Sequence, residues 1–161
     1  MERVIALLET LKRPGTDKLI EFVRTSNYAA ARCHAHHTYA GGLVDHSLEV
    51  YDLMMERRGN LPEDSIIVCA LLHDLDKVYR GEHNPKRGIA ILDKCGFELT
   101  EDERLAILEH HKISENYLTH PLRRCLSSSD MTSTGKWKLV QPSKDILKRA
   151  KDTLLYLFSK F

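Results

Sequence analysis

The chain has almost no net charge, few aromatic residues and no long apolar run. Its 161 residues hold 24 Lys and Arg against 23 Asp and Glu, so no overall field favours nucleic acid or an anionic membrane. No apolar run approaches the roughly 20 residues that span a bilayer. The opening MERVIALLETLKR has charges within its short apolar segment, which is not typical of a signal peptide. We therefore expect a cytoplasmic protein without a membrane segment.

Paired cysteine motifs are also missing. Cys33, Cys69, Cys95 and Cys125 are far apart and form no C-x-x-C pair. Cys69 lies in an apolar run and is typical of a small core residue. These features indicate free thiols in a reducing compartment rather than a disulfide framework.

Histidine, in contrast, is abundant and clustered. The nine histidines fall into three regions of the chain: His34, His36, His37 and His46; His73 and His83; His110, His111 and His120. This clustering is the first indication of a binding site.

Apolar residues recur at helical spacing along most of the chain, and no segment shows a convincing two-residue alternation. Thr16 is the expected N-cap of the second helix, and Thr100 with Glu103 three residues later forms a capping box. Helices are expected over residues 2–12, 17–25, 43–57, 63–73, 87–94, 100–111 and 121–131, and from Ser143 onward. We therefore expect an all-α fold in which residues 1–161 form one domain.

Ionisable residues follow the most apolar of these helices. Residues 70–77 read ALLHDLDK, directly after the apolar run 65–69. Charged groups beside a core helix are costly to desolvate unless they are paired or bind a metal. Candidate partners are His46 within one helix, His110 at the end of another and Asp130 near the end of a third. Imidazole and carboxylate groups that converge from several helices can bind a transition metal.

The order His, then His-Asp, then Asp in an all-α chain resembles the HD-domain phosphohydrolase superfamily. The resemblance covers residues 40–131. The stretch HHTYAGGLVDHS at residues 36–47 is especially similar to small stand-alone bacterial and phage hydrolases and to the HD domain of a bacterial exoribonuclease. The resemblance implies a single compact HD-type helical bundle. It also implies metal ligands at His46, His73, Asp74 and Asp130 and, as in members with two metals, at His83 and His110.

One position departs from the family pattern, and at another two adjacent histidines are candidates for the same ligand. Asp76 stands where many members have a small residue, and it adds charge near the metal, pairs with Lys77 or is solvated. His111 is adjacent to His110 and competes with it as a ligand. The register favours His110, which leaves His111 as a candidate for substrate contact.

Other residues are further candidates for substrate contact. His36 and His37 are expected to line the entrance and contact phosphate, unless they form structural hydrogen bonds. Lys77 would neutralise a phosphate oxygen or orient a bridging carboxylate, unless it is a surface lysine at a helix end. Trp137 between two lysines would stack on a base or cover the core. The remaining basic candidates are Lys86, Arg87, Lys112, Arg123 and Arg124. We expect most of these side chains to be solvated and one or two of them to reach a substrate phosphate.

Two metals about 3.5 to 4 Å apart lower the pKa of a shared water and hold a phosphoryl oxygen. A mixed imidazole and carboxylate set suits Mn, Fe, Ni, Co or Zn. We therefore expect a phosphohydrolase that cleaves a phosphomonoester or phosphodiester, with Asp74, Lys77 and Asp76 as catalytic residues. A small nucleotide is the first choice of substrate, and a short single-stranded nucleic acid is the second.

A metal-binding module without turnover, acting in regulation or nucleotide binding, is the alternative. A coordination shell closed by protein ligands would favour the module, whereas an enzyme keeps a position open for water.

Overall fold

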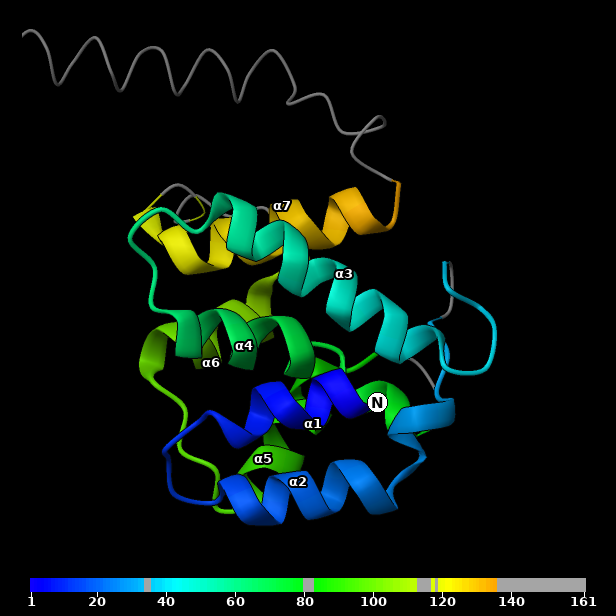
Figure 1. The fold of residues 1–161 in the computed structure, drawn as a ribbon. Helices are drawn as coiled ribbons and strands as arrows, with labels where there is room; N and C mark the ends of the chain where they lie inside the picture. Colours follow the sequence, from blue (N-terminus) through cyan, green and yellow to red (C-terminus); the bar gives the residue numbers. More distant parts are fainter. Residues whose placement is uncertain (34–35, 80–82, 113–116, 118, 136–161) are drawn as a thin grey trace, which may run out of the picture.

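The computed structural model describes residues 1–33, 36–79, 83–112, 117 and 119–135, and these form an all-α bundle (Figure 1). The prediction of an all-α fold is confirmed: helices and no strands occur over the described residues. The expected helix from Ser143 and the loop with Trp137 lie outside them. The helices are α1 (Glu2–Glu9), α2 (Thr16–Thr25), α3 (Gly42–Arg57), α4 (Glu63–Leu72), α5 (Pro85–Lys94), α6 (Glu101–Glu109) and α7 (Pro121–Ser133), with the short 3-10 helices η1 (Asn27–Ala30) and η2 (Leu75–Val78).

Helix α4 is the centre of the bundle. All its residues from Ser65 to Leu72 are buried, as expected for a helix that is apolar on all sides. It packs against α1, α3, α6 and α7, and Figure 1 shows it between α3 and α7 on one side and α1 and α2 on the other. One apolar cluster includes residues of all seven α-helices. The end of α4 therefore delivers His73 and Asp74 to the interior of the protein.

The helix caps confirm one prediction and correct another. The Thr100 hydroxyl accepts a hydrogen bond from the Glu103 N–H at 3.2 Å, and the Glu103 carboxylate accepts one from the Thr100 N–H at 2.9 Å. Thr16, in contrast, is the first residue of α2, and Gly15 is its N-cap. Gly15 has a φ of +80°, and a Cβ there would stand 2.3 Å from the Gly96 carbonyl oxygen, so only glycine fits this approach.

Arg123 is buried, which corrects the expectation that it is solvated. Its Nε donates to the Glu109 carbonyl at 3.1 Å, its Nη2 donates to the Lys112 carbonyl, and its Nη1 lies 3.2 Å from the Glu109 carboxylate. Carbonyl groups at the C-terminal end of a helix have no partner within the helix. Arg123 supplies donors to them and so ties α7 to the end of α6.

None of the described helices is both long and apolar enough to cross a membrane.

Candidate metal centre

Four of the expected ligands meet at one point inside the bundle. His46 comes from the middle of α3, His73 is the C-cap of α4, Asp74 follows it, and Asp130 comes from α7. Nε2 of His46 lies 3.2 Å from Nε2 of His73, 3.2 Å from Oδ1 of Asp130 and 3.5 Å from Oδ2 of Asp74. Nε2 of His73 lies 3.5 Å from the same Asp74 oxygen. His46, His73 and Asp130 are close enough to share one cation.

The end of α4 explains how two consecutive residues face one target. Adjacent residues of an α-helix point about 100° apart, so His73 and Asp74 would diverge if the helix continued. His73 keeps helical angles, but Asp74 has φ −107° and ψ 21°, after which the chain enters η2. These angles are close to the sparsely populated bridge region, in which many active-site residues lie. The change of direction turns Asp74 toward the His46 group.

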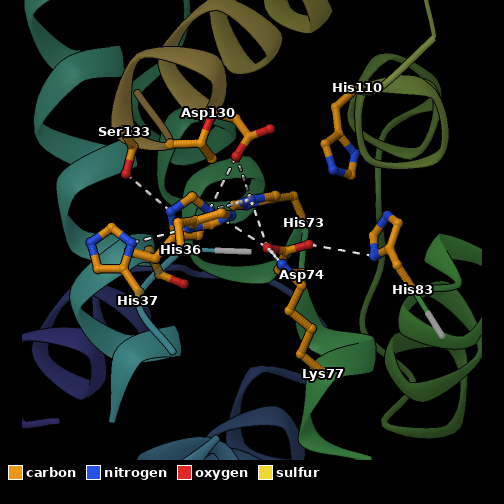
Figure 2. Close-up of polar contacts among 12 residues, drawn as sticks. His36, His37, His73, Asp74, Lys77, His83, His110, Asp130 and Ser133 are labelled. Atoms are coloured by element: carbon orange, nitrogen blue, oxygen red, sulfur yellow. Dashed lines mark hydrogen bonds and ion pairs between the residues drawn. The ribbon is translucent and has the colours of Figure 1, made fainter. Parts of the chain in front are cut away.

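A second group forms on the other side of Asp74. Its members, whose ligand atoms all lie within 4.8 Å of one another, are Asp74, His83, His110 and His111. The rings of His110 and His111 are 3.9 Å apart between centroids, and that of His83 is 4.9 Å from His111. Oδ1 of Asp74 lies 3.6 Å from Nδ1 of His83. Figure 2 shows Asp74 between His36 and His37 on one side and His83 and His110 on the other.

The adjacent histidines at the end of α6 therefore both belong to this group, whereas the sequence register favoured His110 alone. His110 is buried, and His111 is half exposed, with Nδ1 3.5 Å from Oδ2 of Asp130. His110 is the C-cap of α6 and keeps helical backbone angles, with φ −57° and ψ −26°. His111 therefore lies within ligand distance of this group and is also exposed to solvent.

Hydrogen bonds fix which nitrogen each buried histidine presents. Nδ1 of His73 donates to the Ala70 carbonyl at 3.0 Å, and Nδ1 of His110 donates to the Ile107 carbonyl at 2.7 Å. A ring nitrogen that donates in this way leaves the other nitrogen with its lone pair toward the site. Nδ1 of His46 lies 3.0 Å from the Ser133 hydroxyl, which donates to Glu49 at 2.7 Å. All three rings therefore present Nε2 to the centre.

The carboxylates of the centre are held ionised, and burial lowers the pKa of His46, His110 and His111, whereas contact with Asp76 raises the pKa of His83. Burial alone would raise the pKa of Asp74, but electrostatic interactions with His73 and Lys77 outweigh it and hold the pKa well below its usual value. Burial also opposes ionisation of Asp130, but its contact with His46 outweighs burial and lowers the pKa of this carboxyl. Burial lowers the pKa of His110 to about 3. Deprotonated carboxylates and neutral imidazoles are the forms that bind cations.

Buried atoms without hydrogen-bond partners provide a test of metal binding. Among the described residues they include Oδ1 of Asp74, Nε2 of His83 and Nε2 of His110. A buried polar atom without a partner costs free energy, and these three lie in the group around His83. Their donor set of imidazole nitrogen and carboxylate oxygen fits a divalent transition metal. The residues present therefore fit the group that the family resemblance implies.

Asp76 and Lys77 are part of the centre and are not solvated. Asp76 is 1% exposed; its Oδ2 accepts from the Asn84 N–H at 2.7 Å and lies 3.2 Å from Nδ1 of His83. Lys77 donates to Oδ2 of Asp74 rather than pairing with Asp76, and its side chain is only 8% exposed. Asp76 therefore holds His83 in place, and Lys77 is a buried cation against the carboxylate between the two groups.

The remaining residues predicted to contact substrate lie in two different parts of the structure. The His36 ring lies beside His46, with centroids 4.6 Å apart, and Nε2 of His37 lies 3.3 Å from the Glu49 carboxylate. Arg87, in contrast, lines a groove of about 550 Å³ between α2 and α5, together with Lys18, Tyr79 and Lys94 and without any of the histidines. The structure therefore brings His36 and His37 to the centre and does not bring Arg87 there.

Comparison with known proteins identifies the family. The model of the HD domain family matches residues 43–152, which is more than half of the chain. The chain belongs to the HD domain family. It is also similar to the dihydroneopterin 2′,3′-cyclic phosphate phosphodiesterase of Methanocaldococcus jannaschii, with 32% identity over 102 residues that cover 49% of this chain and 41% of the relative. The chain thus spans less than half the length of that relative. No solved structure matches it.

Three residues near the centre carry no signal in the sequence that would have selected them. Ser133 and Glu49 orient His46, and Cys33 lies with His36 and His46 at ligand distance. Each is an ordinary residue at its own position, and only the path of the chain brings it to the histidines.

Proposed function

We propose that this protein is a metal-dependent phosphohydrolase that cleaves a phosphomonoester or phosphodiester of a nucleotide or short nucleic acid. The observation that supports it is the position of Asp74. One of its oxygens lies 3.5 Å from Nε2 of both His46 and His73, and the other lies 3.6 Å from His83. A carboxylate with one oxygen toward each of two ligand groups suits a pair of cations.

His46, His73, Asp74 and Asp130 would hold one cation, and Asp74, His83, His110 and His111 would hold the other. When bound, a pair of divalent metals activates water at neutral pH and neutralises charge on the phosphoryl group. The metal would be Mn, Fe, Ni, Co or Zn, because both groups combine imidazole with carboxylate.

The protein's own groups would position the phosphate and manage its charge. Lys77 is a buried cation at the bridging carboxylate, where an ammonium group stabilises the negative charge that develops at phosphorus. His111 is half exposed beside the second group, and so it can reach both the interior and an entering ligand. Asp76 keeps His83 oriented through its contact at 3.2 Å and would act on the reaction through that ring.

The relative narrows the choice of substrates for a first screen. That relative acts on a 2′,3′-cyclic phosphate, which is a small phosphodiester. The formal net charge of +1 also favours a small nucleotide over a long polyanion. We therefore place nucleoside 2′,3′-cyclic phosphates first, other small nucleotides second and short single-stranded oligonucleotides third.

The decisive test measures metal content and turnover on the same preparation. Protein purified without chelator is analysed for metal per chain and assayed with Mn²⁺ on these three classes of substrate. Asp74→Asn is expected to lower turnover at least about 100-fold and to lose bound metal, because it removes a charged ligand. Asp93→Asn is the matched control, since Asp93 lies on α5, is exposed and pairs with Arg104.

Full activity and full metal content in Asp74→Asn would overturn the proposal. Tightly bound metal without turnover of any substrate would favour the alternative, a metal-binding module that acts in regulation or nucleotide binding.

A further inference from the structure

The turn before α3 holds a thiol and an imidazole against His46. The Cys33 N–H donates to the His37 carbonyl at 3.2 Å and closes this turn. The same carbonyl presses on the start of α3, where a Cβ at Gly42 would stand 1.8 Å from its oxygen. The centroid of the His36 ring lies 4.6 Å from that of His46. Cys33 and His37 are therefore held to each other, and His37 is held against the start of α3.

Ligand atoms of Cys33, His36 and His46 lie within 4.8 Å of one another, close enough to share one small cation. Cys33 is 2% exposed and His46 is fully buried. Neither ligand group of the proposed hydrolase uses Cys33 or His36. A sulfur ligand changes the preference of a site, because thiolate selects softer cations such as Zn²⁺ over Mn²⁺ or Mg²⁺.

His46 is common to this group and to the group of His73 and Asp130. Its Nδ1 is engaged by the Ser133 hydroxyl at 3.0 Å, so Nε2 is the nitrogen available to either group. One imidazole nitrogen has one lone pair and binds one cation at a time. The two groups therefore compete for a single ligand atom.

We propose that Cys33, His36 and His46 form a sulfur-containing site for a soft divalent cation such as Zn²⁺, and that filling it withdraws His46 from His73 and Asp130. The Cys33 thiol releases its proton to solvent when sulfur binds the cation. Water would complete the coordination of these three protein ligands. The competition for His46 rests on the proposed function, whereas ligation by sulfur does not.

Cobalt absorption tests the sulfur ligand independently of turnover. Full-length protein is freed of metal with a chelator and titrated with Co²⁺ in the presence of a thiol-free reductant. Bound Co²⁺ gives weak visible bands with any ligands, but a strong near-ultraviolet charge-transfer band only with thiolate. Wild type is expected to show both, and Cys33→Ser is expected to lose the charge-transfer band while keeping the visible bands. His36→Ala is expected to weaken the Co²⁺ affinity read from that band by about tenfold.

Cys95→Ser is the matched control, because Cys95 is a buried free thiol that belongs to none of the ligand groups found among the described residues. It should keep the charge-transfer band. Visible bands without a charge-transfer band in wild type, or a charge-transfer band that survives in Cys33→Ser, would overturn the sulfur site. Either result leaves metal-dependent turnover to be judged by its own assay.

Discussion

The Lys77 ammonium group donates to Oδ2 of Asp74, the same oxygen that lies 3.5 Å from Nε2 of His46 and of His73. Both side chains are almost fully buried. Burial would lower the pKa of Lys77, but the negative charge of Asp74 outweighs it and raises the pKa above its usual value. Lys77 is therefore charged at neutral pH. Its positive charge would repel a metal cation bound at Asp74.

Replacing Lys77 with Met should separate metal binding from turnover. Loss of a buried positive charge a few ångströms away should strengthen divalent metal binding at least about tenfold, which is about 1.4 kcal/mol. Turnover should fall by about 100-fold, because a positioned cation that stabilises the transition state is lost. Metal titration and steady-state kinetics on Lys77→Met measure the two effects. Weaker metal binding in this variant would contradict the inferred repulsion.

Ser133→Ala should impair metal binding through His46. The Ser133 hydroxyl contacts Nδ1 of His46 at 3.0 Å and donates to Glu49, which also faces His37. Partners that orient a ligand ring typically contribute 10- to 100-fold to metal affinity, so we expect a loss of about tenfold. Ser128→Ala on the same helix is the control, because the Ser128 hydroxyl donates only to the Cys125 carbonyl. Equal affinities in the two variants would show that Ser133 does not orient the ring.

Gly42→Ala should disturb the turn that carries His36 and His37. A Cβ at Gly42 would stand 1.8 Å from the His37 carbonyl oxygen, so the turn or the start of α3 must move. We expect destabilisation by about 1 to 3 kcal/mol, as for other overpacked sites. Gly88→Ala within α5 is the contrasting variant, because its Cβ would be 3.6 Å from the nearest heavy atom outside the helix, the backbone nitrogen of Asp76. It should be neutral or stabilise by up to about 1 kcal/mol, and urea unfolding measures both.

Much of the fold follows from local patterns in the sequence. The apolar run of α4 predicts a central helix, and the spacing of Thr100 and Glu103 predicts the capping box that α6 has. The prediction that Thr16 is the N-cap of α2 was wrong. The N-cap is Gly15, because only glycine fits the close approach to Gly96 at this position. That approach joins residues far apart in the chain, and periodicity contains no information on it.

The candidate site shows the same division between local and tertiary information. A family motif selects His46, and it predicts His73 and Asp74 although α4 ends at Leu72, just before them. Burial of Asp76 and its contact with His83 depend on where His83 and Asn84 lie relative to η2, so the sequence left three interpretations open. Solvation and pairing with Lys77 are now excluded for Asp76. Arg123 looked like a solvated charge because its carbonyl partners belong to the end of another helix.

Glu103 is a buried charge outside the centre that accepts hydrogen bonds from three other residues. Its carboxylate is fully buried and accepts from both Arg13 terminal nitrogens at 2.7 and 2.9 Å, from the Ser65 hydroxyl at 2.7 Å and from the Thr100 N–H at 2.9 Å. Burial would raise its pKa, but the hydrogen bonds, led by Arg13, lower the pKa below its usual value. The carboxylate therefore links α6 to α4 and to the segment after α1.

The lowered pKa of Glu103 gives its contribution to stability a definite pH dependence. The unfolded chain binds the proton more tightly, so this stabilisation is complete above the ordinary Glu pKa of about 4.3 and is lost as pH falls toward the folded value. Glu103→Gln should lower the free energy of unfolding by about 3 kcal/mol at pH 7, and the difference from wild type should shrink below about pH 4. Urea unfolding across this range measures it, with exposed Glu101→Gln expected within about 0.5 kcal/mol of wild type. A difference that stays constant down to pH 3 would mean that packing, and not the charge of Glu103, accounts for the loss.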